Sequence, residues 1–268
     1  MRPPSEQSPA PRPELHRGAT WVLDLDGVVW LTGEPIPGVG DAVARLRTAG
    51  VRVLFATNNS SPTVDELLAR LARGHIEAGL DDVLSSAQAA ATLVEPGSTV
   101  LGLAGPGVAE AMTARGAVLV RDGQADADAV VVGWTQEFDF DRLTRATRAV
   151  LAGARLIGTN DDPALPTPDG LLPGAGALLA AVATASGCTP EVAGKPHQPL
   201  ADLITRRVGT VDLVVGDRPT TDGLLARRLH APFALVLSGV TAPDAPLPDP
   251  LPDFVADDLA ALVPSAPT

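Results

Sequence analysis

The sequence predicts an α/β protein built around a parallel sheet with helices on both faces. Short apolar runs of strand length alternate along the chain with segments whose apolar residues recur three and four positions apart, which is the period of an amphipathic helix. This alternation is typical of a parallel sheet whose connections are helices. The middle third of the chain repeats the alternation by itself, which indicates a second α/β unit.

The main unit is predicted from four apolar runs and the amphipathic segments that follow them. Strands are expected at residues 20–26, 51–57, 211–217 and 231–239, and helices at 38–50, 61–74 and 220–230. A further helix is expected to begin near Pro199. The proline-rich residues 241–254 are expected to form an extended connector to a short final helix.

The middle unit is predicted from its own three apolar runs. Strands are expected at 98–105, 128–135 and 155–160, and helices at 108–116, 140–153 and 174–187. About 100 residues are enough for a separate small module. We therefore expect a discontinuous core domain at 18–85 and 189–268, an inserted α/β domain at 86–188 and a disordered tail at 1–17.

The composition limits the partners of the protein. Its 268 residues, 45% of them hydrophobic, can form a large core. A formal charge of −12, from 20 basic against 32 acidic residues, opposes binding to nucleic acid or to an anionic membrane. No apolar run approaches the roughly 18 residues of a membrane span, and the amino terminus lacks the apolar centre of a secretory signal. We expect a cytoplasmic protein in which the single Cys188 is a structural thiol.

Four polar clusters follow apolar runs of the main unit. They contain Asp24, Asp26 and Gly27; Thr57 and Asn58; Lys195; and Asp217 and Asp222. In an open parallel sheet, ligands bind at the carboxyl ends of the strands. We therefore expect these clusters to converge on one site.

The two aspartates after the first strand imply a cation. Asp24 and Asp26 are two positions apart, so on a continuing strand their side chains would share one face while Leu25 points into the core. Two carboxylates this close repel one another unless a cation lies between them or one of them holds a proton. With Asp217 as a third oxygen donor, the set favours Mg²⁺ over Ca²⁺ or Zn²⁺.

The remaining groups indicate a phosphate site beside this cation. Gly27 permits a sharp turn that exposes backbone N–H groups to an anion, while Thr57 offers a hydroxyl, Asn58 an amide and Lys195 a positive charge. One aspartate can then attack phosphorus while its neighbour protonates the leaving oxygen and later activates water. The cation offsets the repulsion between an anionic nucleophile and an anionic substrate.

Five stretches, in this order, resemble the motifs of the haloacid dehalogenase superfamily. They are DLDGVVW, ATNNSSPT, TNDDPALPTPDGLLPGAGAL, VAGKPHQPL and VVGDRPTTDGLLARR, and they extend from about residue 20 to 240. They are most similar to the phosphatase branch that contains the NagD-type nucleotide phosphatases and the p-nitrophenylphosphatases. The resemblance implies a Rossmann-like core with an α/β cap of the C2 type inserted between ATNNSSPT and VAGKPHQPL, which match the second and third motifs of the superfamily.

The resemblance also implies roles for the matching acidic residues. Asp24 matches the nucleophile that forms an aspartyl-phosphate, and Asp26 matches the general acid and base. Asp217 matches the acidic metal ligand, together with Asp24 and the backbone carbonyl of Asp26. Asp222 matches a carboxylate near the lysine or a metal-bound water. The dehalogenases of the superfamily lack the second aspartate because a halide leaving group needs no proton, so Asp26 favours phosphate transfer.

The phosphate-binding residues implied by the resemblance are Thr57 and Lys195, with Asn58 nearby. One departure from the pattern lies after the strand expected at 211–217, where Pro219 and Thr220 occupy a loop that often carries an acidic residue in relatives. Because Asp217 and Asp222 are both present, we still expect metal binding.

The cap is expected to choose the substrate. Its candidate contacts are Asn160, Asp162, Leu165 and Gly174. Leu165 stands where relatives that act on pyridoxal phosphate carry a histidine, which counts against that substrate. The resemblance also implies a homodimer formed through the cap.

We therefore expect a Mg²⁺-dependent phosphomonoesterase for a small phosphorylated metabolite. The candidate substrates are a sugar phosphate, glycerol phosphate, phosphoglycolate and, in vitro, p-nitrophenyl phosphate. A nucleoside 5′-monophosphatase is the alternative, and its base would stack on Trp134, Phe138 or Phe140, the aromatic residues of the predicted cap. A non-catalytic module that binds phosphorylated metabolites is a further alternative, but it would have no use for an acid beside a nucleophile.

Overall fold

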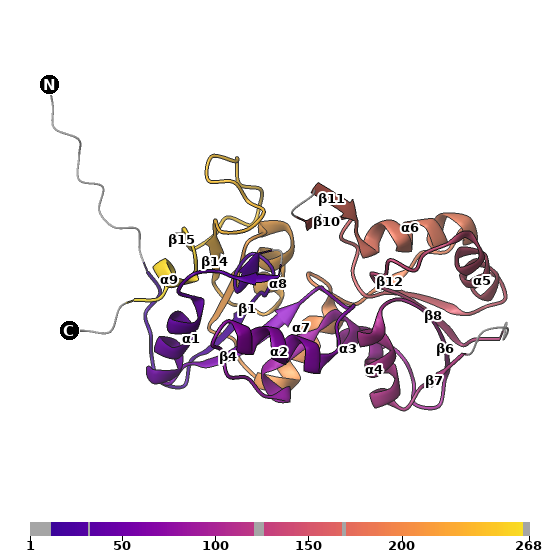
Figure 1. Ribbon diagram of the computed structural model, residues 1–268, viewed down its shortest axis with the longest axis horizontal. Coiled ribbons are helices and arrows are strands. Elements are labelled where there is room, and N and C mark those ends of the chain that lie inside the picture. The colour runs from indigo at the N-terminus through magenta and orange to yellow at the C-terminus, as the bar shows by residue number, and fades with distance from the viewer. Residues whose placement is uncertain (1–11, 32, 121–125, 168–169, 265–268) are drawn as a thin grey trace, which may run out of the picture.

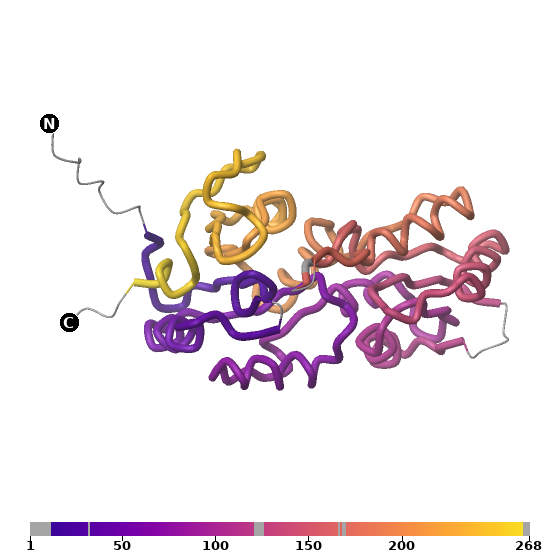
Figure 2. Tube along the Cα trace, turned by 45° about the horizontal axis from the view of Figure 1, so that its top comes forward, coloured from indigo at the N-terminus to yellow at the C-terminus, as the bar shows by residue number. Residues whose placement is uncertain are grey.

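The computed structural model describes residues 12–31, 33–120, 126–167 and 170–264. Most of the predicted tail lies outside these ranges. Within the described part of that tail, Pro13 is buried and Leu15 packs against the core. Two α/β units lie side by side along the long axis (Figure 1). The first and last described segments meet at the end of the core that is farthest from the second unit (Figure 2).

The core unit is a six-stranded sheet in the order β15-β14-β13-β1-β4-β5, and every neighbouring pair is parallel. Its strands are β1 (Thr20–Leu23), β4 (Arg52–Thr57), β5 (Val83–Ser85), β13 (Leu213–Gly216), β14 (Phe233–Val236) and β15 (Phe254–Ala256). The predicted parallel sheet is therefore confirmed. β5 and β15 were not predicted, and β15 follows directly after the proline-rich connector.

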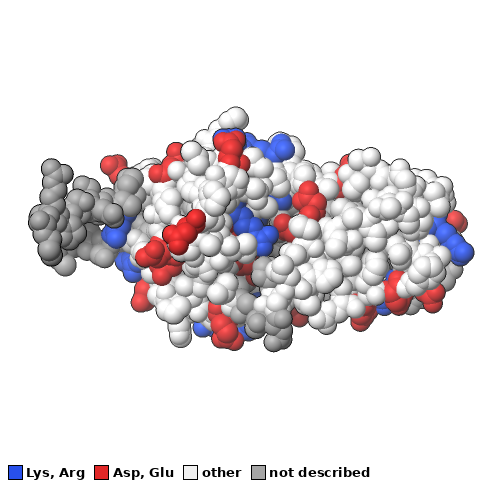
Figure 3. All heavy atoms as spheres, turned by 90° about the horizontal axis from the view of Figure 1, so that it is seen from above, with Lys and Arg blue, Asp and Glu red and all other residues white. Residues whose placement is uncertain are grey.

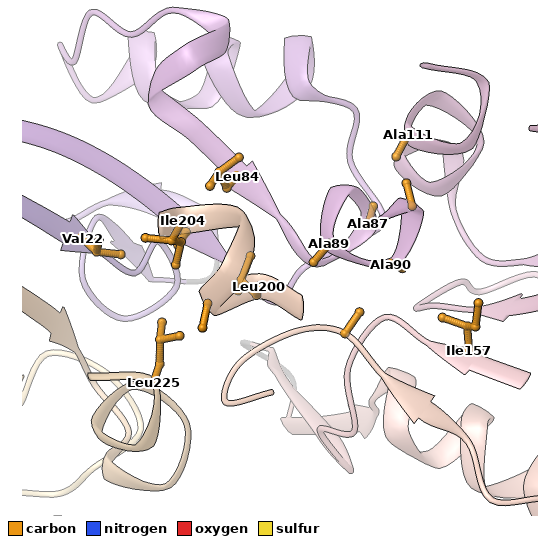
Figure 4. Close-up of a cluster of buried hydrophobic side chains, with 14 of the residues drawn as sticks. Val22, Leu84, Ala87, Ala89, Ala90, Ala111, Ile157, Leu200, Ile204 and Leu225 are labelled. Carbon is orange, nitrogen blue, oxygen red and sulfur yellow. The ribbon is translucent and has the colours of Figure 1, made fainter. Parts of the chain in front are cut away.

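Helices cover both faces of this sheet because successive side chains of a strand point to opposite faces. Trp21 and Leu23 of β1 pack with α1 (Val39–Thr48), α2 (Val64–Arg73) and α9 (Leu259–Leu262). Val22 packs on the other side with α7 (Gln198–Val208) and α8 (Leu224–Arg228), as Figure 4 shows. Short turns at η1 (Leu80–Asp82) and η2 (Pro219–Gly223) complete the unit.

Local sequence explains where these helices begin. At α2, the Thr63 hydroxyl accepts a hydrogen bond from the Glu66 N–H, and the Glu66 carboxylate accepts one from the Thr63 N–H. This capping box satisfies backbone donors that the first helical turn leaves unpaired. The cap at Thr63 therefore starts α2, and the segment from Asn58 to Ser61 is the loop between the end of β4 and this helix.

The second unit has a five-stranded parallel sheet in the order β12-β9-β8-β6-β7. Its strands are β6 (Thr99–Leu103), β7 (Val118–Leu119), β8 (Ala129–Val132), β9 (Arg155–Gly158) and β12 (Glu191–Val192), and its helices are α4 (Pro106–Arg115), α5 (Phe140–Leu151) and α6 (Ala175–Ser186). α5 and α6 pack on one face of the sheet, through residues such as Val130 and Leu179. We call this unit the cap.

The two units are tightly packed where they meet. One buried cluster runs from Leu54 of the core sheet through α3 (Ser86–Ala91) to Val131 and Ile157 of the cap sheet. Gly107 of the cap lies so close to the core loop that a Cβ there would be 2.1 Å from the Pro62 carbonyl oxygen. A side chain at this glycine would force the units apart.

Two hairpins lie outside the main sheets, and neither was predicted. β2 (Trp30–Leu31) pairs with β3 (Glu34–Pro35) after the first motif, and β10 (Ala164–Thr167) pairs with β11 (Gly170–Pro173) in the cap. Among the residues described, no helix has the length and apolar character needed to cross a membrane.

Candidate active site

Asp24 lies at the carboxyl end of β1. Its N–H donates to the Val215 carbonyl and so continues the parallel ladder by one residue. Its Oδ1 accepts the Leu25 N–H at 2.7 Å. Leu25 is buried, as expected from the pleat. The carboxylate of Asp24 is thus held at the edge of the sheet with only 9% of the residue exposed.

Asp26 is exposed and is held by two side chains. The Trp30 indole N–H donates to Oδ1 at 2.9 Å, and the Thr57 hydroxyl donates to Oδ2 at 3.4 Å. The strand does not continue through Asp26, because β1 ends at Leu23 and a tight turn follows. Thr57 therefore contacts the second aspartate from the end of β4.

Gly27 is required by this turn. Its φ of +84° lies in the left-handed region, and a Cβ there would be 2.5 Å from Oδ2 of Asp217. Its own N–H donates to the Trp30 carbonyl at 2.7 Å, and its carbonyl accepts the Ser238 hydroxyl at 2.6 Å. The sequence predicts that this turn exposes backbone N–H groups to an anion. The N–H of Gly27 itself is not exposed in this way, because it is bonded to Trp30.

The two remaining acids come from the end of β13. Oδ2 of Asp217 accepts the Val240 N–H at 2.7 Å. Asp222 lies one turn later, in η2, where its N–H donates to the Arg218 carbonyl and its Oδ2 accepts the Arg218 N–H at 3.1 Å. The loop that contains Pro219 and Thr220 thus folds back and returns Asp222 to the site. Both acids are buried.

Lys195 joins the acids from the segment between β12 and α7. Its ammonium group lies 2.6 Å from Oδ1 of Asp24 and 2.7 Å from Oδ1 of Asp222, and the residue is only 2% exposed. Carboxylate oxygens of Asp24, Asp217 and Asp222 all lie within 4.8 Å of one another. Groups that are far apart in the sequence are therefore gathered at one edge of the core sheet.

The site holds more negative than positive charge. Burial raises the pKa of Asp24 well above its ordinary value, and Asp222 and Asp217 raise it further, while Lys195 opposes the shift. Burial and Asp222 raise the pKa of Asp217 to about 6. Burial alone would lower the pKa of Lys195, but Asp222 and Asp24 hold it above its ordinary value. Three carboxylates beside one ammonium group suit a hard divalent cation with oxygen ligands.

A cavity of about 130 Å³ opens over these groups between the core and the cap. It is lined by ten of the residues named from the sequence: Asp24, Asp26, Gly27, Asn58, Asn160, Asp162, Leu165, Gly174, Lys195 and Asp217. Thr57 and Asp222 lie directly behind this lining, where they bond to Asp26 and Lys195. Figure 3 shows basic and acidic side chains next to one another between the two units.

Sequence reasoning missed seven further contributors to the cavity wall. They are Leu31, Asn59, Ala164, Ala175, Arg218, Thr221 and Val240. Arg218 and Thr221 lie within the stretch VVGDRPTTDGLLARR, beside Asp217, and this proximity could have identified them. Trp134, which was considered as a stacking residue, also lines the cavity, with its indole N–H donating to the Pro173 carbonyl at 3.1 Å. Phe140 instead lies on the surface.

Asn58 makes several contacts at the junction of the two units. Its Oδ1 accepts the Lys195 N–H at 2.7 Å, and its Nδ2 donates to the Lys195 carbonyl at 3.0 Å and to Oδ2 of Asp162 at 2.9 Å. Its own carbonyl accepts the Asn160 amide at 2.7 Å and the Ser86 hydroxyl at 2.6 Å. Both amide hydrogens of Asn58 are therefore used within the protein.

Comparison with known proteins agrees with this arrangement. The family model described as haloacid dehalogenase-like hydrolase matches residues 21–118, and a second one, described as HAD-hydrolase-like, matches residues 192–262. D-glycerol 3-phosphate phosphatase of Mycobacterium tuberculosis is 38% identical over 249 residues, which are 90% of this chain and 70% of that protein. The chain belongs to the haloacid dehalogenase-like hydrolases.

Other members of this family are similar over nearly the whole chain. An acid sugar phosphatase of Staphylococcus saprophyticus is 34% identical over 82% of this chain and 87% of its own length. The crystal structure of the M. tuberculosis glycerol phosphate phosphatase with magnesium superposes with a TM-score of 0.82 at 37% identity, over 91% of this chain and 76% of that one. The p-nitrophenyl phosphatase of Archaeoglobus fulgidus gives 0.83 at 29% identity, over 92% and 98%. The chain thus lies in the NagD-like phosphatase branch of the superfamily.

Proposed function

We propose that this protein is a Mg²⁺-dependent phosphomonoesterase that hydrolyses a small phosphorylated metabolite through an aspartyl-phosphate on Asp24. The observation that carries the proposal is the contact of Asp24 with Lys195 beside two further buried acids, with Asp26 next to them on an exposed turn. The phosphatase relatives support the same reaction class. A module that only binds phosphorylated metabolites would gain nothing from this pairing of acids.

The residues present fit a magnesium ion. Asp24, Asp217 and the backbone carbonyl of Asp26 would hold it, with the Asp222 carboxylate close by, and these are the hard oxygen donors that the ion prefers. A magnesium-bound structure of the M. tuberculosis relative supports this choice. When bound, the ion favours the ionised form of the carboxylates and offsets their repulsion of an anionic substrate.

In the first step Asp24 attacks phosphorus. Its Oδ1 is held by the Leu25 N–H and by Lys195, whereas its Oδ2 accepts no hydrogen bond from the residues that the structure describes. One carboxylate oxygen of Asp24 forms the new bond to phosphorus, while the bond from phosphorus to the substrate oxygen breaks. Asp26 gives its proton to that leaving oxygen, so the product is a neutral alcohol.

In the second step Asp26 acts in the opposite direction. It takes a proton from a water molecule, the water oxygen bonds to phosphorus, and the bond from phosphorus to Asp24 breaks. Trp30 and Thr57 hold the two oxygens of Asp26, so the same carboxyl group stays near the reaction in both steps. Asp24 and Asp26 are thereby returned to their starting forms.

Lys195 supplies the positive charge that holds the phosphoryl group, and Thr57 is a second candidate through its hydroxyl. Lys195 is suited to this because its pKa is raised, so the ammonium form persists over the working pH range. Gly27 contributes the turn that keeps the Asp26 loop against Asp217. Asn58 has no unused amide hydrogen, so its side chain does not donate to the phosphoryl group.

The cap selects the alcohol part of the substrate. Its contribution to the cavity is mainly apolar or amide in character, from Trp134, Leu165, Asn160 and the start of α6. The phosphatase relatives support a short alcohol such as glycerol or a sugar. Trp134 is the one feature that favours a nucleoside 5′-monophosphate, because an indole can stack on a base.

A substrate panel separates the two candidates. We expect higher kcat/KM for glycerol phosphate and sugar phosphates than for nucleoside monophosphates, each measured with Mg²⁺ and with a chelator. A clear preference for nucleotides that is lost in Trp134→Ala would favour the alternative.

The test of the proposed reaction is Asp24→Asn. Activity should fall to background because the amide is a poor nucleophile, while circular dichroism should be unchanged. Asp202→Asn, an exposed substitution on α7, is the matched control and should keep full activity. Retention of activity in Asp24→Asn would contradict the assignment.

Assembly through the cap and a cytoplasmic location are also part of the proposal. α5, on the cap, exposes Phe140 and Leu151 at 80% and 66%, and an interface between two caps would cover such side chains. Light scattering should then give twice the chain mass, and Phe140→Asp should halve it. Cell fractionation tests the location.

A further inference from the structure

The side chain of Asn58 bonds to both backbone polar groups of Lys195. Its carboxamide accepts the Lys195 N–H at 2.7 Å and donates to the Lys195 carbonyl at 3.0 Å. A carboxamide can pair with both backbone groups of one residue because its oxygen and nitrogen are fixed in one plane. The ammonium end of the same lysine is held separately by Asp24 and Asp222. Asn58 thus fixes the end of Lys195 that the acids do not reach.

The same amide also reaches the cap. Its second hydrogen is donated to Oδ2 of Asp162 at 2.9 Å, and the other carboxylate oxygen of Asp162 lies 3.6 Å from the Arg218 guanidinium. The Arg218 N–H in turn donates to Asp222, the partner of the Lys195 ammonium group. The contacts therefore form a closed ring: Lys195 backbone, Asn58, Asp162, Arg218, Asp222 and the Lys195 ammonium group.

The packing around this ring leaves little room for another arrangement. A Cβ on Gly194 would be 2.5 Å from Oδ1 of Asn58 and 2.6 Å from the Thr159 carbonyl oxygen, so only glycine permits the approach. The Asn58 carbonyl is held by Asn160 from the cap and by Ser86 from α3. Asp162 is itself oriented through its N–H, which donates to Oδ1 of Asn160 at 3.1 Å.

We propose that Asn58 is a positioning residue for Lys195, and that Asp162 of the cap fixes Asn58 in the conformation that holds the lysine. The cap would then do more than select the alcohol, because its attachment to Asn58 would set the position of the positive charge that binds the phosphoryl group. The inference rests on the proposed function for the role of Lys195. Its structural part, the hold on the Lys195 backbone, is independent of that function.

Hydrogen exchange of the full-length protein tests the structural part without any assay of activity. In Asn58→Ala the Lys195 amide loses its acceptor and should exchange faster than in the wild type. Asp162→Asn should increase the exchange rate less, because the Asn58 carboxamide remains. Thr63→Ala is the matched control, since it removes the cap of α2 five residues after Asn58 and leaves the contacts of Lys195 intact. Unchanged exchange at Lys195 in Asn58→Ala would overturn the proposal.

Kinetics test the functional part with p-nitrophenyl phosphate as substrate and inorganic phosphate as inhibitor. A displaced ammonium group should raise the inhibition constant for phosphate and lower kcat/KM by up to about 100-fold. A residue that only supported the fold would reduce the amount of active enzyme and leave the inhibition constant unchanged. Thr63→Ala should leave both parameters at wild-type values.

A reciprocal exchange tests the link to the cap. Asn58→Asp places a carboxylate against Asp162 and should be severely impaired. Adding Asp162→Asn restores one hydrogen bond between the two side chains, so the double variant should recover part of the activity and part of the phosphate affinity. Additive losses would overturn the link to Asp162. If Asp24→Asn kept full activity, the proposed function would fail, but the exchange result at Lys195 would still stand on its own.

Discussion

Asp217→Asn should make the protein more stable in a chelator and remove the stabilisation that Mg²⁺ provides. Burial and Asp222 raise the pKa of Asp217 to about 6 from an ordinary value of 3.8. The native state therefore binds more protons than the unfolded state between these two values, so the free energy of unfolding falls as pH rises through this window. The difference corresponds to roughly 3 kcal/mol once the pH is well above 6. An asparagine has no carboxylate to ionise, and its Oδ1 can still accept the Val240 N–H.

Urea denaturation well above pH 6 measures this effect. In a chelator, Asp217→Asn should unfold at a higher urea concentration than the wild type, by up to about 3 kcal/mol in the free energy of unfolding. At a Mg²⁺ concentration a hundredfold above Kd, the wild type should gain about 2.7 kcal/mol, whereas the variant should gain little. Asp202→Asn should behave as the wild type under both conditions. A variant that is less stable in chelator, or that gains as much from Mg²⁺ as the wild type, would refute the reasoning.

Three other substitutions test separate parts of the site and fold. Asp26→Asn should lower kcat/KM, which excludes hydrolysis of the aspartyl-phosphate, far more for glycerol phosphate than for p-nitrophenyl phosphate, because nitrophenolate leaves without a proton; equal losses in kcat/KM would contradict the acid role. Gly27→Ala should destabilise the fold by roughly 1–3 kcal/mol, since φ is positive and the new Cβ meets Asp217. An unchanged denaturation midpoint would contradict the requirement for glycine at this turn. Thr63→Ala should cost about 1 kcal/mol in stability, with normal activity per folded molecule.

Much of the fold could be predicted because strong strands and helices carry their own periodic signals. The core strands and the helices on their two faces are long enough to be recognised. β12 has only two residues, and β15 follows a run of prolines, so neither gives a periodic signal. The cap hairpin at β10 and β11 contains exposed Leu171 and Leu172, which look like core residues in the sequence.

The convergence of the site could be predicted because parallel strands end at one edge of a sheet. This rule places Asp24 and Asp217 together without knowledge of any side-chain contact. The rule does not predict which side-chain amides, such as that of Asn58, have hydrogens left to bind a substrate. The contacts of Asn58 depend on how the cap packs against the core loop, and Arg218 reaches Asp162 only through the fold of η2. Such contacts across two units have no local signal in the sequence.

Trapping of the phosphorylated enzyme tests the central claim most directly. The enzyme is mixed with substrate and Mg²⁺, quenched in acid during turnover, and treated with borohydride, which reduces an acyl phosphate of aspartate to homoserine. Mass spectrometry of the peptides should then locate homoserine at position 24 and nowhere else. Its absence from position 24 under conditions of full turnover, or its appearance at another aspartate, would contradict the account.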